Sequence, residues 1–386
     1  MTVPARRRRE SDVQITVCRP DELGEGELDL WRDFQRATPT LRNPYLAPEF
    51  SVVVGRHRPQ ARVAVLSHGP RVVGFFPFER GRLGAGGPIA HNLTGGQGVV
   101  HAPGAEWDPE QLLRACGLAV WEFDSLVEGQ EPFRPYEAVR VACPIMDLGR
   151  GWDAYLAERL DRSPSTFRDL PRRRRKLARE VGEVRFVHDT ADRAALRTLM
   201  AWKSDQYRRT GRSDRFTWPG VPEILDELLG TRTATFSAVL SGLYAGDVLA
   251  SATVVLRSHC AAAGWFSGYD RALSRYSVGM QAQLAAAEAF AGAGVRHLQM
   301  GRGPRDVYKQ ALKSYDAVVA EGRVLRRTPT AALHWAKAAP TRRIRHLVTE
   351  SPTLLKAADR TLCRYGQLRS SLSRRTDRSE LTGVSR

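Results

Sequence analysis

The stretch that decides the fold is AAAGWFSGYDRALSRYSVGMQAQLAAAEAFAGAGVRHLQMGRGPRDVYKQALK, residues 261–313. Its pattern predicts a strand ending at Tyr269 and Asp270, a polar turn, an alanine-rich helix, a second short strand, a glycine turn and a helix that opens near Tyr308 and Lys309. The first turn of a helix leaves backbone N–H groups unpaired and carries the positive end of the helix dipole. We therefore expect an anionic group, such as the phosphate of a cofactor or substrate, to bind where the first strand leads into the alanine-rich helix.

The composition narrows the class of protein. A chain of 386 residues is long enough for two domains, and its net charge is +17 because 59 basic residues stand against 42 acidic ones. Such an excess attracts polyanions but does not choose among nucleic acid, acidic lipid and phosphorylated ligands. The five cysteines are odd in number and form no CxxC pair, which argues against a disulfide framework and a zinc site and favours a reducing compartment. No apolar run reaches the roughly 18 residues of a membrane span. We expect a cytoplasmic protein without a metal, whose basic segments allow it to lie at the inner face of the membrane.

Two hairpin-like segments suggest that the chain has two halves built on one plan. Residues 62–80 and 236–257 each combine the letters VLS, a glycine turn and a second apolar run that starts at valine. Between them, the pattern predicts a helix over residues 111–124. The glycine-rich segment 84–98 has two interpretations, a flexible surface loop or a backbone that approaches a ligand closely.

The basic segment 151–182 also leaves two interpretations open. It predicts two helices that are broken at Ser163 and Pro164, and the second carries the run RRRRK. The helices are either a linker with its arginines in water or a contact face for phosphate or nucleic acid. The expected organisation is a disordered basic arm (1–12), an N-terminal half (13–150), basic linker helices (151–182), a C-terminal half (183–327), and a basic helical tail that is partly disordered (328–386).

Several motifs together carry a family resemblance. They are RRRRKLARE before VRF, the run VLASATVVL, the letters GYD, the segment YSVGMQAQLAAAEAFAGAG and the segment QMGRGPRDVYKQALKSY. With these motifs, residues 152–325 resemble the acetyltransferase domain of CelD/BcsL-type proteins, a FemAB-like branch of the GNAT superfamily. The leading region, with NPYLAPEF and RVVGFFPFE, is similar to the corresponding part of such proteins. The resemblance implies an α/β fold of tandem GNAT-like domains, with mixed, mostly antiparallel sheets flanked by helices, around a cleft.

The resemblance also implies a function. It is transfer of an acyl group, expected to be acetyl from acetyl-CoA, to an amine or hydroxyl of a small-molecule, envelope or polysaccharide precursor. Of the GNAT cofactor motif, only Arg275 and Gly279 remain. Two alternatives therefore stay open: a FemAB-like transferase that uses aminoacyl-tRNA bound by the basic segments, and a non-catalytic GNAT-like protein whose basic tail binds an anionic surface.

Acyl transfer to an amine needs a grip for the donor, a base for the ammonium proton and a proton donor for the leaving thiolate. Asp270, at the end of the first strand, is the expected base, with Glu288 as the weaker alternative, and Tyr308 is the expected proton donor. The expected cofactor-binding residues are Arg271, Arg275, Tyr276, Ser277, Gly279 and Lys309. For each of these residues a structural role, in a surface ion pair or in packing, is the competing interpretation.

Overall fold

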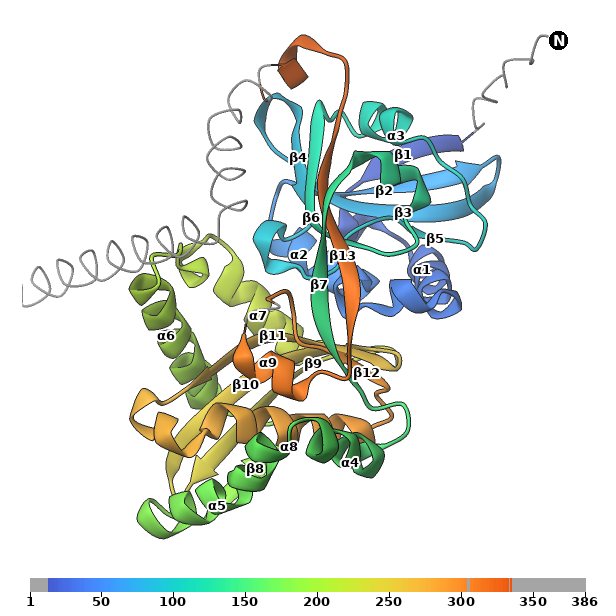
Figure 1. Ribbon diagram of the computed structural model, residues 1–386. Coiled ribbons are helices and arrows are strands. Elements are labelled where there is room, and N and C mark those ends of the chain that lie inside the picture. Colours follow the sequence, from blue (N-terminus) through green and yellow to red (C-terminus); the bar gives the residue numbers. More distant parts are fainter. Residues whose placement is uncertain (1–12, 304–305, 333, 335–386) are drawn as a thin grey trace, which may run out of the picture.

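One sheet runs through both halves of the chain (Figure 1). The computed structural model describes residues 13–303, 306–332 and 334, so the predicted arm and all but the first residues of the predicted tail lie outside the described residues. The strands are β1 (Val13–Cys18), β2 (Ala61–His68), β3 (Arg71–Arg80), β4 (Ala85–Pro88), β5 (Val100–His101), β6 (Val120–Val127), β7 (Glu137–Asp147), β8 (Val184–Val187), β9 (Phe236–Ala245), β10 (Val248–Ser258), β11 (Ala261–Tyr269), β12 (His297–Gln299) and β13 (Tyr315–Leu325). Their order is β1-β2-β3-β4-β6-β13-β7-β12-β11-β10-β9-β8, and β5 pairs with β3.

The helices cover both faces of this sheet. They are α1 (Glu25–Ala37), α2 (Pro48–His57), α3 (Pro109–Ala115), α4 (Trp152–Arg162), α5 (Pro164–Glu180), α6 (Arg193–Arg209), α7 (Val221–Gly230), α8 (Val278–Gly292) and α9 (Val307–Leu312). Successive side chains of a strand point to opposite faces, so Leu240 packs with α6 and α7 whereas its neighbour Val239 packs with α4 and α8. In the C-terminal half, α6 and α7 therefore lie on one face of the sheet and α8 on the other (Figure 1).

The last strand joins the two halves. The sequence predicts a strand over residues 317–325 that closes the second half, and β13 covers this range. Its partners, however, are β6 and β7 of the N-terminal half, through pairs such as Val324 with Trp121 and Tyr315 with Ile145. On its other side β7 pairs with β12 of the C-terminal half, where Met146 lies opposite Leu298. The two halves consequently share one continuous hydrogen-bonded sheet.

Two expectations from the sequence need correction. The predicted helix over 111–124 is only α3, which ends at Ala115, and residues 120–127 form β6. Gly117, with a φ of +66°, turns the chain, and the alternation of buried Trp121 and Phe123 with exposed Glu122 suits a strand. The glycine-rich segment is no surface loop, because Leu93, Gln97 and neighbouring residues are buried, and Leu93 packs with residues of both halves.

We expect Gly322 in β13 to tolerate no side chain. A Cβ atom there would lie 2.6 Å from Cζ of Phe123 and closer still to the Tyr136 carbonyl oxygen. Because this glycine lies in the strand that links the halves, Gly322→Ala should lower the free energy of unfolding by about 3 kcal/mol, measured by urea denaturation. Gly230→Ala, where nothing lies within 4 Å of the added Cβ, is the matched control and should change stability little. Equal stability of the two variants would contradict the packing described for β13.

Candidate active site

The site lies where two neighbouring parallel strands separate. β11 and β12 pair only between residues 261–263 and 297–299, whereas β11 continues to Tyr269. Beyond Ala263, no other described strand pairs with this edge of β11. An unpaired strand edge presents backbone N–H and C=O groups to an extended ligand that carries amides. The fold therefore has a notch, defined here as the edge of residues 264–269, with which no described strand pairs. At its start the Tyr45 hydroxyl donates a hydrogen bond of 3.5 Å to the Gly264 carbonyl oxygen.

A β-bulge fixes the notch against the N-terminal half. Phe266 lies opposite Val254 and Gly264 lies opposite Val255, so Trp265 is the extra residue between them. The Trp265 indole Nε1 donates a hydrogen bond of 2.9 Å to the Leu93 carbonyl oxygen. Its ring also packs edge-on at 5.9 Å from Phe50 of α2. The glycine-rich segment and α2 thus hold this edge in position.

The predicted anion-binding loop follows the end of β11. The Asp270 carboxylate accepts a hydrogen bond of 2.8 Å from the Ala272 N–H and caps the 3-10 helix η8 (Arg271–Tyr276). Ser277, with a φ of +56°, then leads into α8. A Cβ atom on Gly279 would lie 3.1 Å from the Tyr269 ring, so glycine lets α8 begin close to the end of β11.

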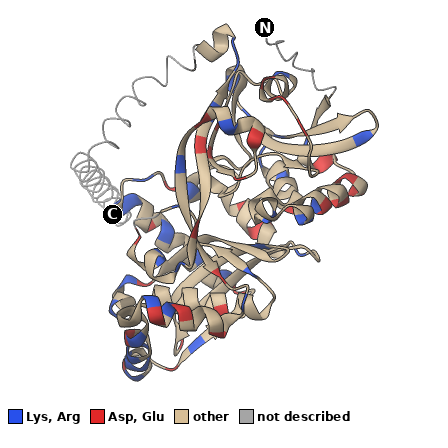
Figure 2. Cartoon of the chain, turned by 45° about the vertical axis from the view of Figure 1, so that its right-hand side comes forward, with Lys and Arg blue, Asp and Glu red and all other residues tan. Residues whose placement is uncertain are grey.

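Basic helix α5 contacts this loop. The residues of the run 172–176 lie on α5, where positions of Lys and Arg are concentrated (blue in Figure 2). Arg173 donates a hydrogen bond of 2.8 Å to the Ser277 hydroxyl and a second of 3.4 Å to the Arg275 carbonyl oxygen. Arg271 and Arg275 are exposed beside it. Three arginines therefore lie at the loop that leads into α8: Arg271 and Arg275 of η8, and Arg173 of α5. Arg173 belongs to the basic segment for which the sequence left two roles open, a linker or a phosphate-contact face.

Tyr276 anchors α5 to the loop. Its side chain is fully buried, and its hydroxyl donates a hydrogen bond of 2.7 Å to the Glu180 carboxylate at the end of α5. This hydrogen bond holds the pKa of Glu180 below its usual value, and the charges of Lys176 and Arg275 act in the same direction. Arg275 also lies over the Tyr276 ring, 4.7 Å from its centre. The Tyr276 side chain is therefore not available to a ligand.

The second predicted group surrounds the glycine turn before α9. The buried Lys309 ammonium donates 2.8 Å to the Arg302 carbonyl oxygen and forms an ion pair of 3.2 Å with Asp306. Burial, with the Asp306 charge, raises the pKa of Tyr308 to about 12, so its hydroxyl keeps its proton at neutral pH. Glu288 is exposed on α8. Among the described residues, no hydrogen bond or ion pair joins Asp270 to Tyr308 or Lys309, so the structure presents two separate groups.

The sequence interpretation missed Lys203. It lies on the face of α6 formed by Leu196, Leu199, Met200 and Tyr207, and a single lysine in an apolar stripe was the available signal. Its ammonium lies 5.2 Å from the centre of the Tyr207 ring and donates 2.8 Å to the Gln206 amide oxygen. Burial, together with the positive charges of Arg215, Arg212 and Lys309 and against the opposing charge of Asp306, lowers the pKa of Lys203 to about 8. Lys203 therefore lies within electrostatic range of Lys309, while its contacts are to Gln206 and Tyr207 of its own helix.

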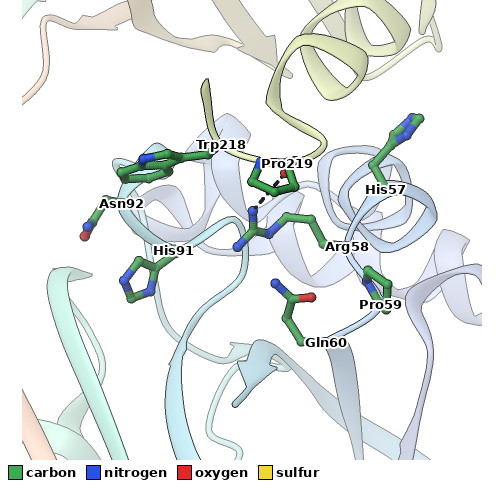
Figure 3. A pocket seen from close by; sticks show the side chains of 8 residues that line it. All are labelled: His57, Arg58, Pro59, Gln60, His91, Asn92, Trp218 and Pro219. Atoms are coloured by element: carbon green, nitrogen blue, oxygen red, sulfur yellow. Dashed lines mark hydrogen bonds between the residues drawn. The ribbon is translucent and has the colours of Figure 1, made fainter. Parts of the chain in front are cut away.

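A cavity of about 350 Å³ lies between the two halves on the α7 side (Figure 3). Its walls are His57, Arg58, Pro59, Gln60, His91, Asn92, Trp218 and Pro219. The Arg58 guanidinium donates to the Pro219 carbonyl oxygen at 3.4 Å and forms an ion pair of 2.6 Å with Glu79. The sequence offered no sign of this cavity, because its walls come from three distant segments.

A family comparison covers the part of the chain that forms the notch. Residues 164–310 match the model of the acetyltransferase (GNAT) domain family. The match begins with α5, includes β11 and α8, and ends in α9. This segment is thus similar to a GNAT-type acetyltransferase domain. The finer CelD/BcsL-type assignment stays a prediction, and none of the curated proteins matches this sequence.

Solved structures resemble the fold over most of the chain. The C-terminal domain (DUF2156) of a putative lysylphosphatidylglycerol synthetase from Agrobacterium fabrum has a TM-score of 0.50 at 12% identity, over 81% of this chain and 96% of that one. A tandem GNAT protein from the clavulanic acid biosynthesis pathway has a TM-score of 0.48 at 13% identity, over 81% and 98%. FemX has a TM-score of 0.45 at 10% identity, over 68% and 87%. At such identities the likeness concerns the fold, and the predicted α/β class, with a mixed sheet flanked by helices, is confirmed.

Two further observations are limited to the described residues. No helix there is long and apolar enough to cross a membrane. No group of three or more His, Cys, Asp or Glu side chains there could hold a metal ion.

Lys203 leads to a prediction about pH. Its pKa of about 8 in the folded chain is below the ordinary 10.5, so the unfolded chain binds this proton more tightly. The charged lysine therefore destabilises the folded state below pH 8, and this destabilisation disappears as the pH rises from about 8 to 10.5. We expect Lys203→Gln to raise the melting temperature at pH 7 by about 2–4 °C and to have a smaller effect at pH 10.

Arg208→Gln is the control, because Arg208 is exposed on the same helix. Melting curves of both variants at the two pH values test the prediction. A lower melting temperature for Lys203→Gln at pH 7 would contradict it.

Proposed function

We propose that this protein is an acyltransferase that moves an acetyl group from acetyl-CoA to an amine or hydroxyl of a small acceptor, with an envelope or polysaccharide precursor as the expected class. The observation that carries the proposal is the combination, in a segment that matches the GNAT family, of an unpaired strand edge with the arginine-lined start of a helix. The donor has the matching chemistry, because CoA combines an extended arm that contains amides with a pyrophosphate.

Donor binding follows from these two features. The amides of the extended arm would pair with the free edge of β11, as an added strand would. The pyrophosphate would accept hydrogen bonds from the first backbone N–H groups of α8, within reach of Arg173 and Arg275. The same proposed phosphate-binding site includes Arg271, Ser277 and Gly279. Tyr276 supports this site by holding α5 in place. Lys309 would act through the glycine turn, whose carbonyl oxygens it binds.

The chemical step needs one base and one acid. The acceptor nitrogen or oxygen attacks the thioester carbonyl carbon, the new C–N or C–O bond forms, and the C–S bond breaks. We assign the acceptor's proton to Asp270, whose Oδ1 atom is used by the cap of η8, so that Oδ2 is the proposed proton acceptor. Tyr308, with its pKa near 12, is protonated at neutral pH and is the proposed donor to the thiolate.

We also propose a cytoplasmic location. Cys18, Cys116, Cys143 and Cys260 are free thiols in the described part of the chain, which suits a reducing compartment. Such a compartment is also compatible with a thiol such as CoA as a product.

Calorimetry with acetyl-CoA tests donor binding. We expect saturable binding that weakens about tenfold in the double variant Arg173→Gln with Arg275→Gln, because two cations near the phosphates are lost. The control is Arg71→Gln, which should bind acetyl-CoA as the wild type does, because Arg71 is exposed on β3 and has no hydrogen bond or ion pair to α8 in the described part of the chain. The absence of any binding heat, together with background thiol release from acetyl-CoA with a panel of amines, would refute acetyl-CoA as the donor.

Tyr308 gives a separate test of the chemical step. In Tyr308→Phe the ring remains and the hydroxyl proton is lost, so kcat should fall about tenfold while the Kd for acetyl-CoA stays the same. The expected factor is modest because a thiolate leaves readily even without a proton. Thiol release followed by a colorimetric reagent measures kcat, and an unchanged kcat would remove Tyr308 from the mechanism.

A further inference from the structure

A cluster of cations surrounds the Tyr207 ring on the α6 side of the notch. The Lys203 ammonium lies 5.2 Å from the ring centre, and the Arg215 guanidinium carbon lies 5.8 Å from it. Arg212 and Lys309 are close enough for their charges to act on Lys203. We call Lys203, Arg212 and Arg215 the α6 cation cluster.

This cluster has no carboxylate of its own. Lys309 is paired with Asp306, whereas within the described part of the chain none of the three cluster residues has a carboxylate oxygen within 4 Å. The acidic residues of this region have other partners, including Asp306, whose charge acts on Lys203 from a distance but which is paired with Lys309. Asp205 pairs with Arg209 at 2.8 Å, and the Asp214 carboxylate caps the short helix that begins at Arg215.

An uncompensated group of like charges costs free energy. Lys203 is half-buried, and both the loss of water and its positive neighbours disfavour its charge. Other arginines of this chain, such as Arg173 and Arg209, are paired with an aspartate four residues earlier on the helix. A cluster that lacks such a partner at a cleft is typical of a site whose countercharge arrives with a ligand.

The position of the cluster distinguishes the acceptor from the donor. Tyr207 contacts Phe216, and Phe216 packs at 4.9 Å against Phe266 of β11, so the cluster lies beside the notch. Helix α6 covers one face of the sheet, and α8 covers the other. The donor phosphates are proposed to bind at the start of α8. A ligand group held by the cluster therefore approaches the thioester from the other side.

The neighbouring cavity does not offer the same charge. There Arg58 is compensated by Glu79, and His57 lies 2.6 Å from the Glu227 carboxylate. The basic side chains of the cavity wall, His57 and Arg58 in Figure 3, thus already have acidic partners. An anionic group on this side of the notch is expected at the cluster and not in the cavity.

We infer that the acceptor carries an anionic group, a phosphate or a carboxylate, which Lys203, Arg212 and Arg215 bind while the acceptor's amine or hydroxyl faces the notch. This inference rests on the proposed acyltransferase function and names the acceptor's chemical class. A planar guanidinium can donate two parallel hydrogen bonds to either group, and the ammonium adds a third donor.

Anion binding tests the inference without reference to activity. Melting curves are recorded for the full chain at constant ionic strength with chloride, with inorganic phosphate and with acetate. Phosphate or acetate should raise the melting temperature of the wild type above that in chloride, and whichever anion does so identifies the group. The rise should be smaller in the double variant Lys203→Gln with Arg215→Gln than in the control Arg208→Gln. Because the proposed donor site at the start of α8 also binds phosphate, the comparison is repeated in the background of Arg173→Gln with Arg275→Gln. In that background the remaining rise should disappear once Lys203 and Arg215 are also changed.

Two results would overturn the inference. One is the absence of stabilisation by either anion in the wild type, and the other is equal stabilisation in the Lys203 and Arg215 double variant. The folding of that variant is checked separately by its melting in chloride, so a failure to fold is not mistaken for a loss of binding.

Kinetics separate this inference from the proposed function. With acetyl-CoA as donor, O-phosphoethanolamine or β-alanine should have a KM at least about tenfold below that of ethanolamine, and Lys203→Gln should remove this preference while acetyl-CoA binding stays unchanged. If the wild type does not bind acetyl-CoA, the proposed function is refuted, whereas the result of the anion-binding experiment is unaffected. Acetyl transfer without any preference for the charged amines would strike only the acceptor inference.

Discussion

The pairing of β7 with two different halves of the molecule is the constraint on which the rest of the structure depends. One edge of β7 binds β13 and the other binds β12, so the hydrogen bonds of a single strand connect the N-terminal and C-terminal parts of the sheet. β12 is short, and its pairing with β11 stops at Gln299. The notch exists because the chain leaves the sheet after β12 to form the glycine turn and α9, and returns only as β13.

The contacts around the notch come from all parts of the chain. Trp265 donates to Leu93 of the N-terminal half, and Asn43 donates 2.8 Å to the Gln299 side chain at the end of β12. From the basic helix α5, Arg173 reaches the start of α8. The glycine-rich segment and the basic helix, which look like a loop and a linker in the sequence, are structural parts of the same cleft.

The sequence predicted local structure well and contacts between distant segments poorly. Hydrophobic periodicity located β11, α8 and the hairpins, because each depends on neighbouring residues. It could not reveal that Tyr276 is bonded to Glu180, or that Lys309 holds the carbonyl oxygens of its own turn, because these roles depend on which groups face each other after folding. The candidate loop at residues 270–279 was found through its helix start, whereas Lys203 was overlooked because its helix seemed explained by packing alone. The segment 120–127 was misjudged because a short apolar run fits both a helix and a strand.

The position of β13 has a consequence for how the protein is made. This strand lies between β6 and β7, yet it is synthesised about 170 residues after β7. During translation, β6 and β7 emerge from the ribosome as neighbours in the chain that cannot take their final places, because the strand that separates them does not yet exist. Until it arrives, their edges offer unpaired backbone groups to other chains. The N-terminal half therefore cannot finish folding on its own, and we expect the nascent chain to rely on chaperones over that interval.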